Sequence, residues 1–336
     1  MDISLGITIG DPAGIGPEVL LKALPSLRRI PRTRFLVIGD ASVLDRTAAL
    51  LGKKPALPVV HSTADIGKQK IVLLSCDIVG KSACPPGTDS RHGGGASFRY
   101  VERGVGLWRE RIIDGLVTLP ISKRAWHLAG RNYPGHTEYL AEAAGTHDYA
   151  MIMAAGPVRA VLATTHIPFS RIPAALSRDL IVRQGMIGNR FLRESGVPAP
   201  KIGVAALNPH AGEGGLLGTE ERTIILPAVR ELVRRGINAS GPFPADAVFT
   251  RALRGDFDLV VTLYHDQAMI PLKTFFSGRL VNITAGLPFV RTSPGHGTAF
   301  DIAGQGKADP SAFLSACRVA ATLVIARKKT AAGTAP

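Results

Sequence analysis

The stretch LVVTLYHDQAMIPLKTFF, residues 259–276, joins an apolar run directly to a histidine-aspartate pair. Residues 259–263 are apolar except for one threonine, which is typical of a strand buried on both faces. Such strands occur in parallel sheets that helices cover. The simplest interpretation is that Asp266 caps the helix that follows and that His265 is an ordinary loop residue. Whether the pair has a function therefore depends on how the other strands end.

Outward from this stretch, apolar strands alternate with helical patterns along the chain, which predicts an α/β fold with largely parallel sheets. The expected strands are 3–10, 34–40, 70–75, 115–120, 158–166, 201–210, 257–266 and 280–286. The expected helices are 16–27, 41–52, 95–114, 122–130, 177–195, 218–236 and 310–327. The 336 residues exceed one ordinary core and indicate two domains.

The composition is that of a globular protein, with 46% hydrophobic, 20% charged and 6% aromatic residues. No apolar run approaches the roughly 20 residues of a membrane span, and the first residues enter a strand without an export signal. Cys76, Cys84 and Cys317 are odd in number and lack metal-site spacing, which fits a reducing compartment. We therefore expect a cytoplasmic protein without a membrane partner.

The formal net charge of +14 has two interpretations. It could mark a nucleic-acid-binding surface, or a basic shell whose field attracts anionic metabolites. The basic residues are spread through the chain, and the clusters at 28–34 and 327–329 are not interleaved with aromatic residues. The second interpretation is therefore favoured, and no nucleic-acid partner is expected.

Three apolar strands end in a histidine: VRAVLATTH in His166, KIGVAALNPH in His210 and DLVVTLYH in His265. Ligands of open α/β sheets bind outside the carboxyl ends of the strands. Three imidazoles meeting there would form a metal site with one open position, as catalytic zinc sites have. With nine histidines in the chain, chance placement remains the alternative.

Several other stretches could bind an anion. GDPAGIGPE (10–18) resembles a phosphate-binding turn, although a tight turn before a proline-started helix explains it better. His136 and Thr137 stand at a predicted helix start, where Thr137 could also be the N-cap. Lys273, Asn282 and Arg291 follow His265 at short intervals. Each could be an ordinary surface group, and together they could hold a phosphate or carboxylate.

Seven motifs occur in order along the chain: GDPAGIGPE, YPGHTE, ATTH, LNPHAGEGG, GPFPAD, YHDQ and GLPFVRTSPGHGTAFDIAG. Together they resemble the 4-hydroxythreonine-4-phosphate dehydrogenase family of pyridoxal phosphate biosynthesis, from about residue 5 to residue 325. The resemblance implies a homodimer with an isocitrate/isopropylmalate dehydrogenase-like fold, two α/β/α domains and an active site in the cleft between them. Residues 1–130 plus 290–336 would carry the cofactor loop. Residues 131–289 would carry the metal ligands and the dimer interface.

The resemblance also implies roles for individual residues. His166, His210 and His265 would be metal ligands contributed by both subunits. The implied substrate contacts are His136, Thr137, Lys273, Asn282 and Arg291. In HGTAFDIAG (296–304), His296 and Asp301 match the positions that contact the adenosine and its ribose hydroxyls. Asp301 could instead cap a short helix.

The implied reaction is the metal-dependent, NAD-linked oxidation and decarboxylation of 4-phosphohydroxy-L-threonine to 3-amino-2-oxopropyl phosphate. NAD is preferred to NADP because Asp301 has no basic neighbour within the loop. Zinc is the first candidate metal, before cobalt, manganese or magnesium. Asp246 and Asp266 are candidates for proton transfer, with helix capping or support of the metal ligands as the alternative.

Other functions remain open at this point. The same family includes D-threonate and D-erythronate 4-phosphate dehydrogenases, which would use the same phosphate contacts. A dihydrodiol dehydrogenase is disfavoured because LPISK, GHTE and the Lys273, Asn282 and Arg291 set suit a phosphorylated substrate. A basic nucleic-acid-binding protein on a relic enzyme fold would have lost ligands or the cofactor loop, and none is lost.

Overall fold

The computed structural model describes residues 2–54, 57–80 and 84–333 and divides into two compact units. Unit 1 comprises Met1–His147 and Leu287–Ile325, and unit 2 comprises Asp148–Gly286 and Ala326–Pro336. The expected domain boundaries were 130/131 and 289/290, so the structure moves residues 131–147 into unit 1. The reason is aromatic packing, because the rings of Tyr139 and Phe98 lie 4.7 Å apart. Residues 326–336 belong to unit 2, where Arg327 donates to Glu194 at 2.8 Å.

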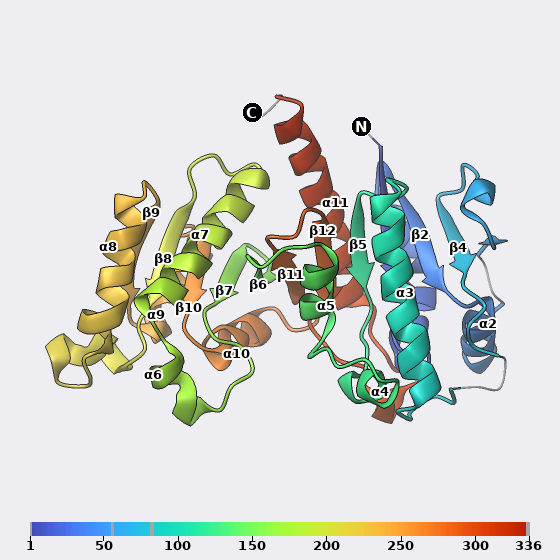
Figure 1. Cartoon of the computed structure of the whole chain (residues 1–336), viewed down its shortest axis with the longest axis horizontal. Helices are drawn as coiled ribbons and strands as arrows, with labels where there is room; N and C mark the ends of the chain where they lie inside the picture. Colours follow the sequence, from blue (N-terminus) through green and yellow to red (C-terminus); the bar gives the residue numbers. More distant parts are fainter. Residues whose placement is uncertain (1, 55–56, 81–83, 334–336) are drawn as a thin grey trace. The chain divides into compact units, whose positions relative to one another are not determined.

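Unit 1 contains six parallel strands in the order β3-β4-β2-β1-β5-β12. Their bounds are β1 Ile3–Thr8, β2 Thr33–Gly39, β3 Val59–Val60, β4 Ile71–Ser75, β5 Gly115–Thr118 and β12 Val290–Pro294. The helices are α1 Gly16–Leu27, α2 Ala41–Leu50, α3 Arg91–Arg109, α4 Lys123–Leu128, α5 His136–Ala143 and α11 Ser311–Ala331, whose residues from Ala326 onward belong to unit 2. Short 3-10 helices cover Thr63–Asp65 and Phe300–Ile302. Figure 1 shows α3 in front of the strands of unit 1.

Unit 2 contains six strands in the order β11-β6-β7-β10-β8-β9. Their bounds are β6 Ala150–Ala155, β7 Val158–Leu162, β8 Lys201–Ala205, β9 Asn238–Phe243, β10 Leu259–Thr262 and β11 Val281–Ala285. The helices are α6 Ile172–Ala175, α7 Arg178–Glu194, α8 Leu226–Arg234, α9 Ala245–Leu253 and α10 His265–Phe275. A π-helical turn, Glu221–Ile225, precedes α8, and short 3-10 stretches cover Phe169–Arg171 and Pro209–Gly215.

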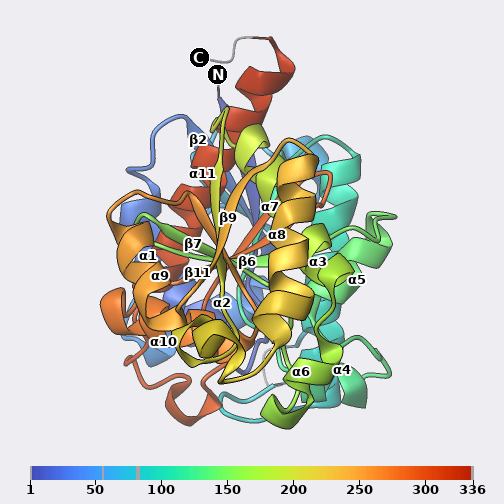
Figure 2. The same cartoon turned by 90° about the vertical axis from the view of Figure 1, so that its left-hand side faces the viewer.

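The predicted α/β class is confirmed, and most strand neighbours are parallel. Among the strand pairs within each unit, two are antiparallel, because β6 runs antiparallel to both β7 and β11. Only the single pair of residues 156 and 157 separates β6 from β7, and a link so short makes a hairpin, whereas a parallel crossover needs a dozen residues or more. In Figure 2, α7 and α8 lie on one side of β9, and α9 and α10 lie on the other.

The stretch 259–263 is the buried strand that its composition predicts. Leu259, Val260 and Val261 of β10 are completely buried, and full burial of such side chains stabilises a fold by about 1.5–3 kcal/mol each. Helix α7 lies close over this strand because Gly188 has no side chain: a Cβ at Gly188 would come within 2.3 Å of Leu259 Cδ2. The core of unit 2 thereby fixes the strand that leads to His265.

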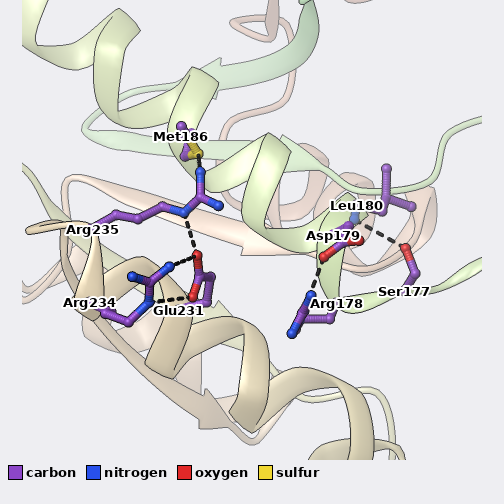
Figure 3. A network of polar contacts seen from close by, with 8 residues as sticks. All are labelled: Ser177, Arg178, Asp179, Leu180, Met186, Glu231, Arg234 and Arg235. Atoms are coloured by element: carbon purple, nitrogen blue, oxygen red, sulfur yellow. Dashed lines mark hydrogen bonds and ion pairs between the residues drawn. The ribbon is translucent and has the colours of Figure 1, made fainter.

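Many basic residues of unit 2 are neutralised by neighbouring carboxylates, as Figure 3 shows for α7 and α8. Glu231 accepts hydrogen bonds from Arg234 at 2.8 Å and from Arg235 at 2.6 Å. These two guanidinium groups lower the pKa of Glu231 to about 2. At the start of α7, Arg178 contacts Asp179 at 3.0 Å. These arginines therefore belong to local ion pairs within unit 2. Across the described residues, no helix combines the length and the apolar character that a membrane span requires.

Candidate active site

The three strand-end histidines all lie in unit 2, beyond three neighbouring parallel strands. His166 follows β7, His210 follows β8 and His265 follows β10, and the order of these strands is β7-β10-β8. The strands end three to five residues before the histidines, earlier than the sequence pattern suggested, because β7, β8 and β10 stop at Leu162, Ala205 and Thr262. All three histidines are therefore in loops or at a helix start at the carboxyl edge.

His166 and His265 lie close together, with ring centroids 5.5 Å apart and an angle of 43° between the ring planes. Two imidazoles that bind one tetrahedral ion at about 2.0–2.1 Å have centroids roughly 5 Å apart. The observed separation therefore fits two ligands of one metal ion. Within the described part of a single chain, no three His, Cys, Asp or Glu side chains are grouped as a metal site. One chain thus brings together two of the three predicted ligands.

His265 is oriented by its neighbour Asp266. Helix α10 begins at His265 with Tyr264 as its N-cap residue, so Asp266 lies in the first turn and does not cap the helix. Instead, Asp266 Oδ1 contacts His265 Nδ1 at 2.7 Å. A carboxylate on one ring nitrogen fixes the ring and leaves the other nitrogen for a metal ion. This contact favours support of a metal ligand over proton transfer as the role of Asp266.

Gln267, the last residue of the YHDQ motif, connects two of the strand ends. Its Oε1 accepts a hydrogen bond from Leu263 N, and its Nε2 donates to Ala206 O, both at 2.7 Å. Gln267 is 6% exposed, so these bonds lie inside the protein. They join the segment before His265 to the segment before His210.

His210 is the first of five consecutive residues with left-handed backbone angles, His210 to Gly214. Three of the five, His210, Ala211 and Glu213, are not glycine. A left-handed conformation costs a non-glycine residue about 1–2 kcal/mol. Strain of this kind persists only where surrounding contacts impose it, and it concentrates at functional sites. The structure therefore places the candidate ligand His210 in a strained turn.

Large apolar side chains follow each histidine and are exposed. Phe169 is 73% exposed after His166, Leu216 is 84% exposed after His210, and Ile270 is 66% exposed after His265. Single exposed apolar residues are common, but here one follows each of the three candidate ligands within six residues of the chain.

In unit 1, the candidate anion contacts are buried and ordered. Arg291 of β12 is 2% exposed, and its Nε and Nη2 donate to Thr118 Oγ1 at 3.2 and 2.7 Å. Burial lowers the pKa of Arg291 to about 10, against the opposing effect of Glu138. The guanidinium is thus still charged at neutral pH, which makes it a strong anion ligand.

His136 lies near this guanidinium and is held by aromatic packing. Its ring contacts Trp126 edge-on, at 5.5 Å between centroids, and Trp126 donates to Ser97 Oγ at 3.0 Å. Burial, and secondarily Arg291, hold the pKa of His136 well below its usual range, so the imidazole is neutral. Its Nε2 is buried without a hydrogen-bond partner among the described residues. Helix α5 begins at His136 with Gly135 as N-cap, so Thr137 lies inside the first turn and is not the cap.

The cofactor-like loop follows β12 and is tied to α1. Ile15 N donates to Thr298 O at 2.9 Å, and Glu18 accepts from Gly306 N at 3.2 Å and from Ala308 N at 2.8 Å. Lys22 pairs with Glu18 at 2.9 Å and donates to the carbonyls of residues 306 and 308. GDPAGIGPE thus serves as the support of this loop, which gives the glycine-rich turn a structural role.

The two predicted cofactor residues, His296 and Asp301, differ in exposure, being half-buried and exposed respectively. His296 Nε2 is buried and has no partner within the described residues, while Nδ1 contacts Gly297 O at 3.0 Å. Asp301 lies inside the 3-10 helix Phe300–Ile302, whose N-cap is Ala299, so it does not cap that helix. Its carboxylate is exposed, as contact with ribose hydroxyls requires.

The remaining predicted residues lie in unit 2. Lys273 is in the last turn of α10, and Asn282 is on β11, with an Oδ1 atom that is buried and unpaired in the described structure. Asp246 is exposed in the first turn of α9. The predicted substrate contacts are therefore divided, with Lys273 and Asn282 in unit 2 and His136, Thr137 and Arg291 in unit 1.

Sequence reasoning missed several buried carboxylates, among them Asp11, Glu18 and Glu221. Their exposed fractions are 1%, 1% and 7%. Each accepts backbone hydrogen bonds, from Ala13 for Asp11 and from residues 13 or more positions away for the two glutamates. Asp11 and Glu18 do lie in a quoted motif, but no pattern in the sequence shows that a carboxylate binds a distant backbone segment.

The comparisons with known proteins point to one family. The family profile described as pyridoxal phosphate biosynthetic protein PdxA matches residues 32–320. A D-threonate 4-phosphate dehydrogenase from Cupriavidus necator is 43% identical over 96% of this chain and 98% of its own length. A 4-hydroxythreonine-4-phosphate dehydrogenase from Caulobacter vibrioides is likewise 43% identical, over 96% of this chain and 98% of its own. The crystal structure of the 4-hydroxythreonine-4-phosphate dehydrogenase from Klebsiella pneumoniae superposes with a TM-score of 0.86, at 39% identity over 96% of this chain and all of that one.

Proposed function

The chain belongs to the PdxA family, and from this premise we propose that it is an NAD-linked dehydrogenase of a phosphorylated 3-hydroxy acid. The first candidate substrate is 4-phosphohydroxy-L-threonine, which would be oxidised and decarboxylated to 3-amino-2-oxopropyl phosphate in pyridoxal phosphate biosynthesis. The observation that carries the proposal is the buried Arg291 beside the neutral His136, because this pair suits a phosphate or carboxylate oxygen. D-Threonate 4-phosphate is the second candidate, since a relative of that name is equally similar.

The residues of this chain would divide the work as follows. Arg291, Lys273 and Thr137 hold the substrate phosphate, and Asn282 Oδ1 and His136 Nε2 provide hydrogen-bonding atoms. Asp301 accepts hydrogen bonds from the ribose hydroxyls of NAD, which disfavours the additional phosphate of NADP. NAD supplies the acceptor for the hydride.

A divalent metal ion fits the imidazole pair of His166 and His265, and we propose that His210 is the third ligand. Zinc is the first candidate because imidazole nitrogens suit it and its tetrahedral sites. When bound, such an ion polarises the oxygen atoms of a substrate. Asp266 holds the His265 ring for this task through Nδ1, and Asp246 stays a candidate for proton transfer.

We further propose that the enzyme is a homodimer in which His210 completes the site of the partner subunit. Two observations support this: one chain groups only two of the ligands, and exposed apolar residues follow all three.

A cytoplasmic location is supported by the free cysteines Cys76, Cys84 and Cys317. No nucleic-acid partner is proposed, because the basic clusters at 28–34 and 327–329 are not interleaved with aromatic residues.

The test is an initial-rate assay of NADH formation by the zinc-loaded enzyme. It compares 4-phosphohydroxy-L-threonine, D-threonate 4-phosphate and D-erythronate 4-phosphate with their unphosphorylated parents. We expect one phosphorylated acid to have by far the highest kcat/KM and its parent to be about a hundredfold poorer, because charged hydrogen bonds contribute about 1.5–3 kcal/mol each. Equal rates with and without the phosphate would reject the proposal and favour a dihydrodiol dehydrogenase.

A further inference from the structure

The left-handed turn from His210 to Gly214 is strained, so some contact outside it must hold it in place. We infer that Glu221 is that contact, and that it is a positioning residue for the metal ligand His210. The inference rests on the proposed function, in which His210 binds the metal ion. It adds a residue outside the ligand set whose loss should weaken metal binding without removing a ligand.

Glu221 fastens the chain immediately before the strained turn. Its Oε1 accepts hydrogen bonds from Leu207 N at 2.9 Å and from Asn208 N at 2.7 Å. Its Oε2 accepts from the side-chain Nδ2 of Asn208 at 2.9 Å. Three donors on one carboxylate fix both the position and the direction of the backbone that enters Pro209 and His210.

The carboxylate itself is immobile, because Glu221 is 7% exposed and stands at the start of the π-helical turn before α8. π-Helical turns are rare and often accompany functional sites. No ion pair to Glu221 occurs among the described residues, so its partners are the N–H groups of 207 and 208. A buried carboxylate whose donors all belong to one loop segment, residues 207 and 208, is explained by the need to hold that loop.

The turn also packs directly against this carboxylate. A Cβ atom at Gly212 would come within 2.7 Å of Glu221 Oε2, so Gly212 leaves room for the carboxylate as well as adopting φ +79°. Gly214, two residues on, has φ +68° but would meet nothing within 4 Å. The two glycines therefore have similar backbone angles and differ in their proximity to Glu221.

This difference supplies a matched pair of variants. G212A and G214A both place a Cβ on a left-handed residue, but only G212A drives it into the Glu221 carboxylate. A second pair is E221Q and E220Q, which neutralise adjacent residues. Glu220 accepts from Thr219 N at 3.0 Å and from Asn208 Nδ2 at 2.8 Å, but not from the backbone of 207 or 208.

Two measurements on the full-length protein test the inference. The first is zinc affinity by competition with a chromogenic chelator. E221Q and G212A should bind zinc about ten- to a hundredfold more weakly, the range typical of groups that support metal ligands, while E220Q and G214A should stay within about threefold of wild type. The second is amide hydrogen exchange of the metal-free protein, where E221Q should accelerate exchange in residues 207–217 and leave β10 unchanged.

The outcomes separate this inference from the proposed function. If His210→Ala binds zinc as tightly as wild type, His210 is not a ligand, and both the proposed metal site and this inference are overturned. If His210→Ala loses zinc while E221Q and G212A keep wild-type affinity, the metal site stands and the inference is overturned. Unchanged exchange at 207–217 in folded E221Q would overturn it as well.

Discussion

The candidate ligand-binding edges of the two units are built in opposite ways. In unit 1, Arg291 is 2% exposed and is already bonded to Thr118, and His136 is kept neutral by burial. In unit 2, His166 and His210 are exposed, and only two of three histidines are grouped in one chain. The first edge is held by contacts within one chain, whereas under the proposed function the second needs a metal ion and a second copy of the chain. This difference predicts which perturbations should affect each edge.

The largest expected effect comes from removing metal. Chelation should reduce turnover by well over the ten- to hundredfold seen when only a supporting group of a metal site is lost. It should leave the Kd for NADH, measured by nicotinamide fluorescence, within about twofold, because Asp301 and His296 belong to the edge of unit 1. Full turnover in chelated protein that contains no metal by elemental analysis would contradict the assignment of the histidines.

The two candidate phosphate ligands should differ in importance. Lys273→Ala removes an exposed ammonium and should lower kcat/KM about ten- to a hundredfold. Arg291→Ala removes a buried guanidinium and leaves a cavity behind. This substitution should lower kcat/KM about a hundred- to a thousandfold. The measurement is kcat/KM for the preferred phosphorylated acid, with Arg103→Ala, a half-buried ion-pair residue of unit 1, as the control. A larger loss of kcat/KM for Lys273→Ala than for Arg291→Ala would contradict this prediction.

Glu18 supports the cofactor-like loop of unit 1, and its loss should have a smaller effect than the loss of Glu221, which supports the His210 loop of unit 2. Glu18 is not the only residue that holds this loop, because Lys22 also donates to the carbonyls of residues 306 and 308. Glu18→Gln should therefore raise the KM for NAD by only about three- to tenfold, close to the loss of one hydrogen bond, with little change in the KM for the acid. The control is Asp114→Asn, which removes a carboxylate bonded to Ser4 N at the other edge of the sheet. A rise in both KM values would point to general destabilisation.

The last expected effect concerns stability and pH. Burial raises the pKa of Asp11 from 3.8 to about 6, and the neighbouring Asp89 adds to this shift. Below pH 3.8 the carboxyl is protonated in the folded and unfolded states alike. Above it the unfolded state loses the proton first, so the free energy of unfolding falls as pH rises to about 6, by roughly 3 kcal/mol.

Asp11→Asn should remove the fall in the free energy of unfolding that the ionisation of Asp11 causes as pH rises. Urea unfolding at pH 4 and pH 7 should show the variant gaining stability relative to wild type as pH increases. A difference between variant and wild type that does not change with pH would show that Asp11 has an ordinary pKa.

Much of this architecture could be predicted from the sequence, because it depends on local patterns. The apolar run 259–263 predicted a buried strand, GPEVLLKALPSL predicted α1, and the spacing of strand and histidine located the edge of unit 2. The assignment of 131–147 to unit 1 was not predictable, because it depends on packing between Tyr139 and Phe98. The roles of Glu18 and Glu221 were hidden for the same reason: each binds backbone atoms that only the folded chain brings near.

Subunit complementation tests the central claim, that the metal site of unit 2 is completed by a second copy. His210→Ala and His265→Ala should each be inactive alone. Co-expressed with separable tags, they should form mixed dimers in which one of the two sites has all three histidines. The account predicts that purified mixed dimers regain about half of the wild-type turnover and bind about one zinc ion per dimer. Mixed dimers that remain inactive and free of zinc would contradict it.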